Sequence, residues 1–261
     1  MAKIPLRIQL PRFVRKDSTS ITIVVDPRDS VRDVMNNVLK ILKLTENCPW
    51  FGLSILHPDG ELQFLTQSEK KIIRFAPESF KRAIERQEKP NTSFTLVFAV
   101  QYFAPHISFV NANDLTIYSA SLRDKLFYPP VLNSASIPEL ETSIELAALC
   151  MRMDKSNTPE GLHVTPGVKF TEELENLIFS SYKTLKIQEM SFTRAQMLFS
   201  KLCMDKIEGL QSHIYRDTKT NDLLSISYSG LGIHTSEGTI KYEFTWDKIS
   251  KLVVNKSVSD N

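Results

Sequence analysis

The sequence predicts an α+β protein of several lobes, because strand-like and helix-like stretches follow one another in three blocks. Residues 4–102 are mostly strand-like, with apolar and polar residues in alternation around one helical stretch. From Asp114 to Leu202 the apolar residues recur every three or four positions, as on amphipathic helices. From His213 short alternating runs return, separated by turn residues.

Composition places the chain among ordinary globular proteins. Of its 261 residues, 42% are hydrophobic and 24% are charged. The 32 Lys and Arg residues nearly balance the 30 Asp and Glu residues, and this net charge of +2 excludes a generally basic nucleic-acid coat. No apolar run reaches about 18 residues, and the start has no signal-peptide core, so we expect a cytoplasmic protein without a transmembrane segment.

The first block predicts a hairpin, a helix and further strands. Ser30 and Asp33 form a weak capping box before a helical spacing of apolar residues that ends at Leu42. The predicted strands are Ile4–Phe13, Ser20–Val25, Trp50–Leu56, Glu61–Leu65 and Ser93–Tyr102. A hairpin, a crossing helix and more strands follow the order of a ubiquitin-like lobe.

The second and third blocks predict a small helical bundle and a β lobe. Helical spacing covers Leu115–Leu126, Ile144–Met151, Leu174–Leu185 and Ala195–Leu202, with Ser191 as an N-cap. Strands are expected at His213–Arg216, Leu223–Tyr228, Leu231–Thr235 and from Lys241 onward. Such strands indicate a sandwich or barrel, although about four are fewer than a closed β lobe normally needs.

Five short stretches, in their order along the chain, resemble sequence motifs of the FERM domain family (band 4.1, ezrin, radixin and moesin type). The resemblance lies in Phe51-Gly52-Leu53, Leu115–Leu126 (LTIYSASLRDKL), Thr142–Met151 (TSIELAALCM), Met190–Phe199 (MSFTRAQMLF), and Gly232-Ile233 with Tyr242–Ile249 (YEFTWDKI). Arg152-Met153-Asp154 and Gly209-Leu210-Gln211 depart from the family pattern.

The resemblance implies a fold and its boundaries. It implies a ubiquitin-like β-grasp lobe over residues 1–103, an acyl-CoA-binding-protein-like helical bundle over 104–208, and a partial PH/PTB-like β-sandwich over 209–261. The third lobe is expected to be truncated, without its later strands and long C-terminal helix. Those elements form the groove where FERM domains take peptide tails, so groove binding is not carried over.

No catalytic, metal or cofactor site is expected. The five histidines are scattered, and no nucleophile, phosphate-loop, zinc-protease or kinase motif is present. A lone histidine here is expected in a turn or on the surface, and Cys48 and Cys203 as small buried apolar residues. The three cysteines lack a CxxC pair, which argues against a disulfide framework or a zinc site. Nucleic-acid binding is not expected either, because the sequence has no RNP, helix-turn-helix or zinc-finger motif.

Residues 70–89 are the strongest candidate for an anion site. Seven cations stand there against three glutamates. One interpretation is a solvated, salt-bridged helix face. The other is attraction to anionic lipid headgroups, by Lys70, Lys71 and Arg74 first. The family resemblance implies a phosphoinositide between Lys70 and Lys71 and basic residues of the third lobe, which correspond to Lys251 and Lys256.

The third lobe raises a further question about its apolar residues. Tyr242 and Trp246 share one face of a predicted strand, and the default expectation is that they lie in the core. Without a closing helix, such residues (Ile226, Tyr228, Phe244 and Trp246) would stay uncovered. We therefore expect residues 209–261 to be part of a longer chain or to depend on a neighbour.

The resulting expectation is a non-catalytic FERM adaptor, peripheral at the plasma membrane or cytoskeleton. It would bind anionic phosphoinositide headgroups and cytoplasmic tails of membrane proteins, and link them to cytoskeletal or signalling partners. Two alternatives remain. One is a targeting or regulatory fragment of a FERM-containing phosphatase, kinase or myosin. The other is a small acyl-ligand carrier, because the helical bundle resembles acyl-CoA-binding proteins.

Overall fold

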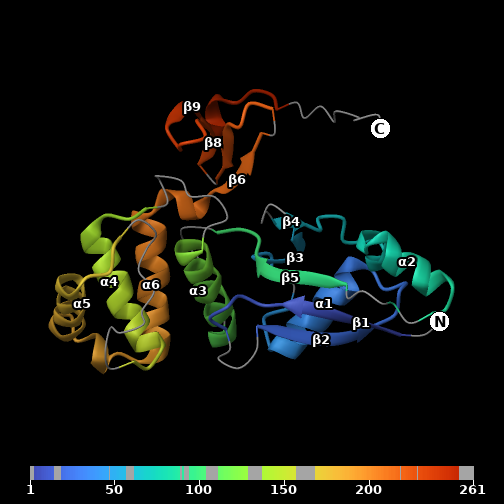
Figure 1. Ribbon diagram of the computed structural model, residues 1–261, viewed down its shortest axis with the longest axis horizontal. Helices are drawn as coiled ribbons and strands as arrows, with labels where there is room; N and C mark the ends of the chain where they lie inside the picture. Colours follow the sequence, from blue (N-terminus) through green and yellow to red (C-terminus); the bar gives the residue numbers. More distant parts are fainter. Residues whose placement is uncertain are drawn as a thin grey trace.

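A computed structural model describes most of the chain. It describes residues 3–14, 19–46, 48–56, 62–88, 90, 94–103, 111–128, 137–156, 168–217, 219–227 and 229–252. Three bodies follow one another along the chain: a five-stranded sheet, a group of helices and a four-stranded sheet (Figure 1). The α+β class and this order of blocks are as predicted.

The five-stranded sheet, here called sheet 1, has the order β2-β1-β5-β3-β4. Its strands are β1 (Ile4–Gln9), β2 (Ser20–Val25), β3 (Phe51–Leu56), β4 (Leu62–Phe64) and β5 (Thr95–Val100). β1 pairs antiparallel with β2 and parallel with β5, so the first and last strands lie side by side. This is the strand order of the ubiquitin-like β-grasp.

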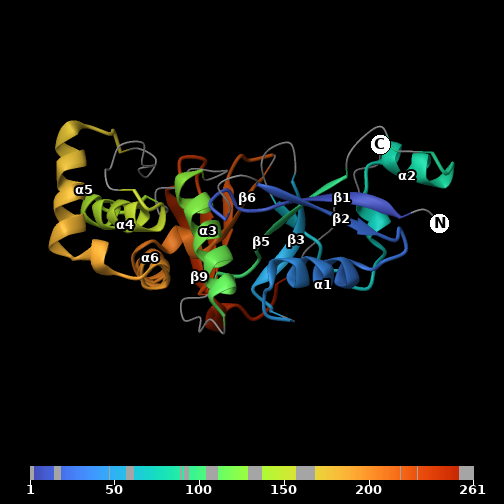
Figure 2. The ribbon, with the colours of Figure 1, turned by 90° about the horizontal axis from the view of Figure 1, so that it is seen from below.

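Helix α1 (Val31–Leu42) covers one face of sheet 1 and closes its core (Figure 2). Its buried side chains recur every three or four residues: Val31, Val34, Val38, Leu39 and Leu42. They meet alternating buried residues of β1 such as Leu6 and Ile8, both fully enclosed. Each such side chain stabilises the fold by about 1.5–3 kcal/mol relative to its exposed state.

A short helix follows β4. The 3₁₀ helix η1 (Ile72–Phe75) leads into α2 (Glu78–Glu85). Phe80 of α2 is buried, with its ring 5.7 Å from that of Phe94. Phe98 is buried as well and Phe75 half-buried, so the aromatic residues near the basic stretch belong to the core.

Four helices form the middle body: α3 (Ala112–Phe127), α4 (Leu140–Met153), α5 (Glu172–Thr184) and α6 (Phe192–Lys206). α4 lies between α5 and α6, and α6 also contacts α3 (Figure 1). The Ser191 hydroxyl accepts a hydrogen bond from the Arg194 amide, which confirms the predicted N-cap of α6. Small residues of α4, such as Ala147 and Ala148, are fully buried at these helix contacts.

The last body is an antiparallel meander, here called sheet 2, in the order β6-β7-β8-β9. Its strands are β6 (His213–Arg216), β7 (Leu223–Ile226), β8 (Gly230–His234) and β9 (Ile240–Thr245), followed by the 3₁₀ helix η5 (Trp246–Lys248). A Cβ on Gly230 would lie 2.0 Å from the Phe244 carbonyl oxygen, so only glycine lets β8 approach β9 here. In the described part of the chain no second sheet faces sheet 2.

Helix α3 stands at the centre of the molecule, between sheet 1 and the other helices (Figures 1 and 2). At one end, the Thr45 amide donates to Asp114 Oδ1 over 3.0 Å. At the other end, the Arg12 amide donates to Asp124 Oδ2 over 2.7 Å. Connecting segments of the first body therefore hold both ends of α3, through the carboxylates of Asp114 and Asp124.

The start of sheet 2 is fixed to both other bodies. The Lys125 ammonium of α3 donates to the carbonyl oxygens of Leu210 and Ser212, over 2.7 and 2.5 Å. His213 Nε2 lies 2.6 Å from the Gln101 carbonyl oxygen, just after β5. These bonds join all three bodies within a few residues of one another.

Candidate functional site

The basic segment after β4 is held against the N-terminus of α1 by backbone hydrogen bonds. The Val31 amide donates to the Lys70 carbonyl over 2.9 Å, and the Arg32 amide donates to the Ser68 carbonyl over 3.0 Å. In return the Ile72 amide donates to the Asp29 carbonyl over 2.9 Å. The first amides of a helix lack partners within it, so this docking satisfies two of them and fixes the segment.

The capping box of α1 completes the same end. The Asp33 amide donates to the Ser30 hydroxyl over 3.2 Å, and the Ser30 amide donates to the Asp33 carboxylate over 2.9 Å. The Ser30 hydroxyl also donates to the Asp33 carboxylate over 2.7 Å, and this bond and the bond from the Ser30 amide lower the pKa of Asp33, because they favour its charged form. The predicted capping box is confirmed, with Asp in the place of the usual Glu.

Lys70, Lys71 and Arg74 project from this fixed backbone, and all three are exposed. Acidic side chains around them already have cationic or amide partners: Glu69 pairs with Arg32, and Asp33 caps α1. Within the described ranges, no acidic side chain lies within 4 Å of the charged atoms of these three residues. They therefore form a cationic surface on a rigid support, here called the basic edge.

Part of the basic stretch behaves as a solvated helix face. On α2 the Lys81 ammonium lies 2.7 Å from a Glu78 carboxylate oxygen, three residues earlier. This bond lowers the pKa of Glu78. The salt-bridged interpretation thus holds for Lys81 on α2, whereas the basic edge keeps uncompensated charge.

Of the two third-lobe lysines that the resemblance implies, only Lys251 lies among the described residues. Lys251 is exposed, in the segment after η5, near the end of the described chain. Lys256 lies outside the described residues. Figure 1 places β4, which precedes the basic edge, on the side of sheet 1 that faces β6. A joint site of the basic edge with Lys251 and Lys256 stays a prediction.

One face of sheet 2 is apolar and uncovered. The strand register brings Leu224, Ile233 and Tyr242 into one row, and Ile226, Leu231 and Phe244 into the next. Tyr242 and Phe244 are 61% and 43% exposed, and their rings stack 6.4 Å apart. The default expectation that Tyr242 and Trp246 lie in the core is wrong. Trp246 sits in η5 and is 41% exposed, because nothing in the described chain covers this face.

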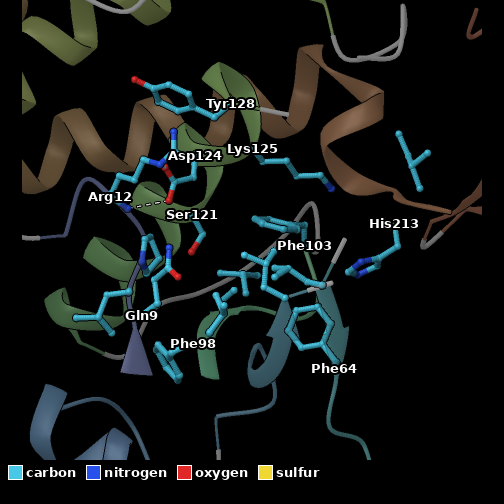
Figure 3. A pocket seen from close by; sticks show the side chains of 18 of the residues that line it. Gln9, Arg12, Phe64, Phe98, Phe103, Ser121, Asp124, Lys125, Tyr128 and His213 are labelled. Atoms are coloured by element: carbon cyan, nitrogen blue, oxygen red, sulfur yellow. Dashed lines mark hydrogen bonds and ion pairs between the residues drawn. The ribbon is translucent and has the colours of Figure 1, made fainter. Parts of the chain in front are cut away.

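A cavity of about 440 Å³ opens where the three bodies meet (Figure 3). The end of β1, the strands β3, β4 and β5, the last turns of α3, and β6 all contribute to its wall. Its floor is apolar and includes Leu10, Phe98 and Phe103, all buried. Such a volume and lining are typical of small-molecule sites.

Lys125 and His213 bound one side of the cavity (Figure 3). Burial lowers the pKa of Lys125 to about 7. Burial, together with the charge of Lys125, also lowers the pKa of His213. The expectation that lone histidines lie in turns or on the surface is wrong for His213, which bonds Gln101, and for His234, which is buried against Ser225. His57, His106 and His163 lie outside the described residues.

The described residues offer no centre for metal or thiol chemistry. Within them, no group of three His, Cys, Asp or Glu side chains is placed to hold a metal ion. Burial raises the pKa of Cys48, of Cys150 to about 11, and of Cys203 well above its usual value. All three thiols are free and protonated at neutral pH. No described helix is long and apolar enough to cross a bilayer.

Comparison with known proteins shows what this chain is similar to. No family model matches the chain. A human protein, tyrosine-protein phosphatase non-receptor type 13, is 22% identical over 254 residues, and the match covers 90% of this chain. It covers only 10% of the phosphatase, so the chain spans about a tenth of that relative's length.

Solved structures give the stronger likeness. The FERM and C-terminal domain complex of Drosophila Merlin has a TM-score of 0.70 and 17% identity, over 97% of this chain and 83% of that one. The MyTH4-FERM MF2 and MF1 domains of Dictyostelium discoideum myosin VII have TM-scores of 0.61 and 0.60 at 13% identity. Both cover 97% of this chain and 52% of theirs. The chain therefore has the fold of a FERM domain.

Proposed function

We propose that the protein is a non-catalytic FERM adaptor, cytoplasmic and peripheral at the plasma membrane or cytoskeleton. It binds anionic phosphoinositide headgroups and cytoplasmic tails of membrane proteins, and links them to cytoskeletal or signalling partners. The basic edge is the single observation that carries this proposal. Its cations are exposed, lack acidic partners in the described chain, and stand on backbone that is hydrogen-bonded to α1.

Electrostatic attraction to an anionic membrane surface supports the proposal. Each Lys or Arg near an anionic surface contributes about 1 kcal/mol of attraction. Lys70, Lys71 and Arg74 together therefore supply about 3 kcal/mol at low salt. Because the segment is already ordered by its bonds to α1, binding costs little additional backbone entropy. Lys251 and Lys256 are the proposed second arm of the same surface.

The proposal keeps the lobe boundaries at 1–103, 104–208 and 209–261. Sheet 1 ends at Val100, the helices run from Ala112 to Lys206, and sheet 2 begins at His213. The first boundary falls between β5 and α3, and the second lies at the start of the 3₁₀ helix η4 (Glu208–Gln211), between α6 and sheet 2. Separate expression of residues 1–208 tests whether sheet 2 depends on a neighbour. If residues 1–261 are no more protease-sensitive than 1–208, that dependence is excluded.

A second candidate is a targeting fragment of a larger FERM-containing enzyme, such as a phosphatase. The sequence match to a phosphatase of which the chain spans about a tenth supports this candidate. Transcript mapping separates the two. A coding sequence that continues from this chain into a catalytic domain favours the targeting fragment.

Co-sedimentation with phosphoinositide-containing vesicles tests the lipid proposal. Lys70→Ala/Lys71→Ala removes about 2 kcal/mol of attraction, so we expect binding to weaken about 30-fold at low salt. The matched control is Lys201→Ala/Lys206→Ala, which removes the same charge from exposed positions of α6. This control should bind within about twofold of the wild type. Equal loss in both double variants would assign binding to net charge and remove the basic edge from the site.

A further inference from the structure

Ser121 and Asp124 of α3 form a polar corner of the cavity between the three bodies, apart from the side that Lys125 and His213 bound (Figure 3). Ser121 is only 6% exposed, and its side chain points from α3 toward the open space. Asp124 Oδ2 accepts the Arg12 amide over 2.7 Å. Gln9 and Arg12 also line this part of the wall, and Leu10, Phe98 and Phe103 are among the apolar residues of the lining.

Two atoms of this corner lack hydrogen-bond partners among the described residues: Ser121 Oγ and Asp124 Oδ1. Both are enclosed, and a buried polar atom without a partner costs free energy comparable to a lost hydrogen bond. The serine hydroxyl offers a donor, and the carboxylate oxygen offers an acceptor. A molecule that accepts one hydrogen bond and donates another would satisfy both atoms.

The charged side chains around the corner determine whether the polar group of that molecule is anionic, cationic or uncharged. The Arg12 guanidinium lies 3.8 Å from Asp124 Oδ1 and already compensates the carboxylate. The Lys125 ammonium bonds the carbonyls of Leu210 and Ser212, so it is held away from the corner. Asp124 would repel an anionic head group of the bound molecule, and Arg12 would repel a cationic one. An uncharged group is therefore favoured.

We propose that this cavity binds a small amphipathic alcohol. Its hydroxyl donates to Asp124 Oδ1 and accepts from the Ser121 hydroxyl, and its hydrocarbon part lies against the apolar wall residues of the cavity, such as Phe103. The cavity volume of about 440 Å³ accommodates a molecule of this class. The site is separate from the basic edge and stands whether or not the protein binds membranes.

Titration calorimetry of the whole chain with 1-octanol, octanoate and octylamine tests the head-group preference. We expect saturable binding of 1-octanol, and at least tenfold weaker binding of octanoate and octylamine. Octanoate bound as tightly as 1-octanol would overturn the proposal and favour an acyl carrier. Absence of saturable 1-octanol binding would overturn it as well, and leave water as the partner of the two atoms.

Two substitutions locate the binding. Ser121→Ala removes one hydrogen bond, so 1-octanol should bind about threefold to tenfold more weakly. Ser121→Leu fills the corner and should abolish binding. The control is Ser200→Ala on α6, because Ser200 Oγ is also buried without a partner in the described chain but lies outside the cavity wall. The control should bind 1-octanol as the wild type does. Unchanged binding in Ser121→Ala, with circular dichroism confirming its fold, would contradict the assigned pose.

Discussion

Arg123 shows how a single residue holds the helical body together. It is 4% exposed, and its guanidinium donates to both Asp154 carboxylate oxygens over 2.9 and 2.7 Å. It also lies 3.9 Å from the centre of the Phe13 ring, which comes from the first block of the chain. The pair therefore joins α3, the end of α4 and the segment after β1.

Asp154→Asn should destabilise the protein by about 2 kcal/mol, because it leaves a buried guanidinium without its counter-charge. The expected cost is below that of a fully buried pair, since the Asp154 side chain is 39% exposed. Urea unfolding measures the change. The control Asp222→Asn breaks the more exposed pair with Lys241 and should cost about 0.5 kcal/mol or less. Equal costs in both variants would contradict this account.

Because the pKa of Lys125 is lowered in the folded protein, we expect the stability of the protein to depend on pH. Its folded pKa is about 7, whereas the ordinary value is 10.5. Between these values the unfolded chain binds more protons than the folded one, so stability contributed by this group rises with pH. Unfolding free energies at pH 7.5, 8.5 and 9.5 should therefore grow for the wild type relative to Lys125→Met. Parallel curves for the two proteins would show that the folded amine keeps its ordinary pKa.

Sequence patterns predicted local residue roles but missed distant ones. Ser30 and Asp33 form the capping box within a span of four residues, so spacing alone revealed it. Lys125 acquires its role from carbonyls 85 and 87 residues away, and His213 from one 112 residues away. No local pattern marks such partners. The alternation of charged and apolar residues only placed Lys125 on a helix.

At the scale of elements, the N-terminus of α1 is a joint between a helix and the basic edge. Ser30→Ala removes the hydroxyl that accepts the Asp33 amide and should destabilise the protein by about 1 kcal/mol in urea unfolding. Ser30→Thr keeps a hydroxyl that accepts the Asp33 amide and donates to the Asp33 carboxylate, so it should recover most of the loss. Equal destabilisation in both variants would mean that the loss does not come from the missing hydroxyl.

We expect the exposed aromatic rings of β9 to bind apolar dyes. Tyr242→Ser/Phe244→Ser should lower the fluorescence of bound anilinonaphthalene sulfonate, because the two rings dominate the uncovered face of sheet 2. Stability should change little, since both side chains are largely exposed. Glu243→Ser, on the opposite face of β9, is the control and should leave the fluorescence unchanged. A dye signal that persists without the two rings would place the apolar surface elsewhere.

Element types followed from the sequence, because each strand and helix carries its own periodicity. The sequence left Trp246 either in the core or uncovered, because alternation says which side chains share a face but not what covers that face. Whether a strand's apolar side becomes core depends on a second layer. In the described chain, sheet 2 has none.

At the scale of the whole molecule, the three bodies meet around α3 (Figure 1), and the cavity shown in Figure 3 opens between them. The order of blocks, read with the family resemblance, predicted this architecture. The cavity could not be predicted, because its wall combines side chains from residue 9 to residue 215. The basic edge could be found from sequence as a run of cations. Its rigidity came only from the bonds to α1.

Amide hydrogen exchange of the protein with phosphoinositide-containing vesicles, and with neutral vesicles, tests the central claim most directly. The account predicts slower exchange on the anionic vesicles over residues 68–76, with no change over α5 on the far side of the molecule. Slower exchange confined to the helical body, or none over residues 68–76 on vesicles that bind the protein, would contradict it.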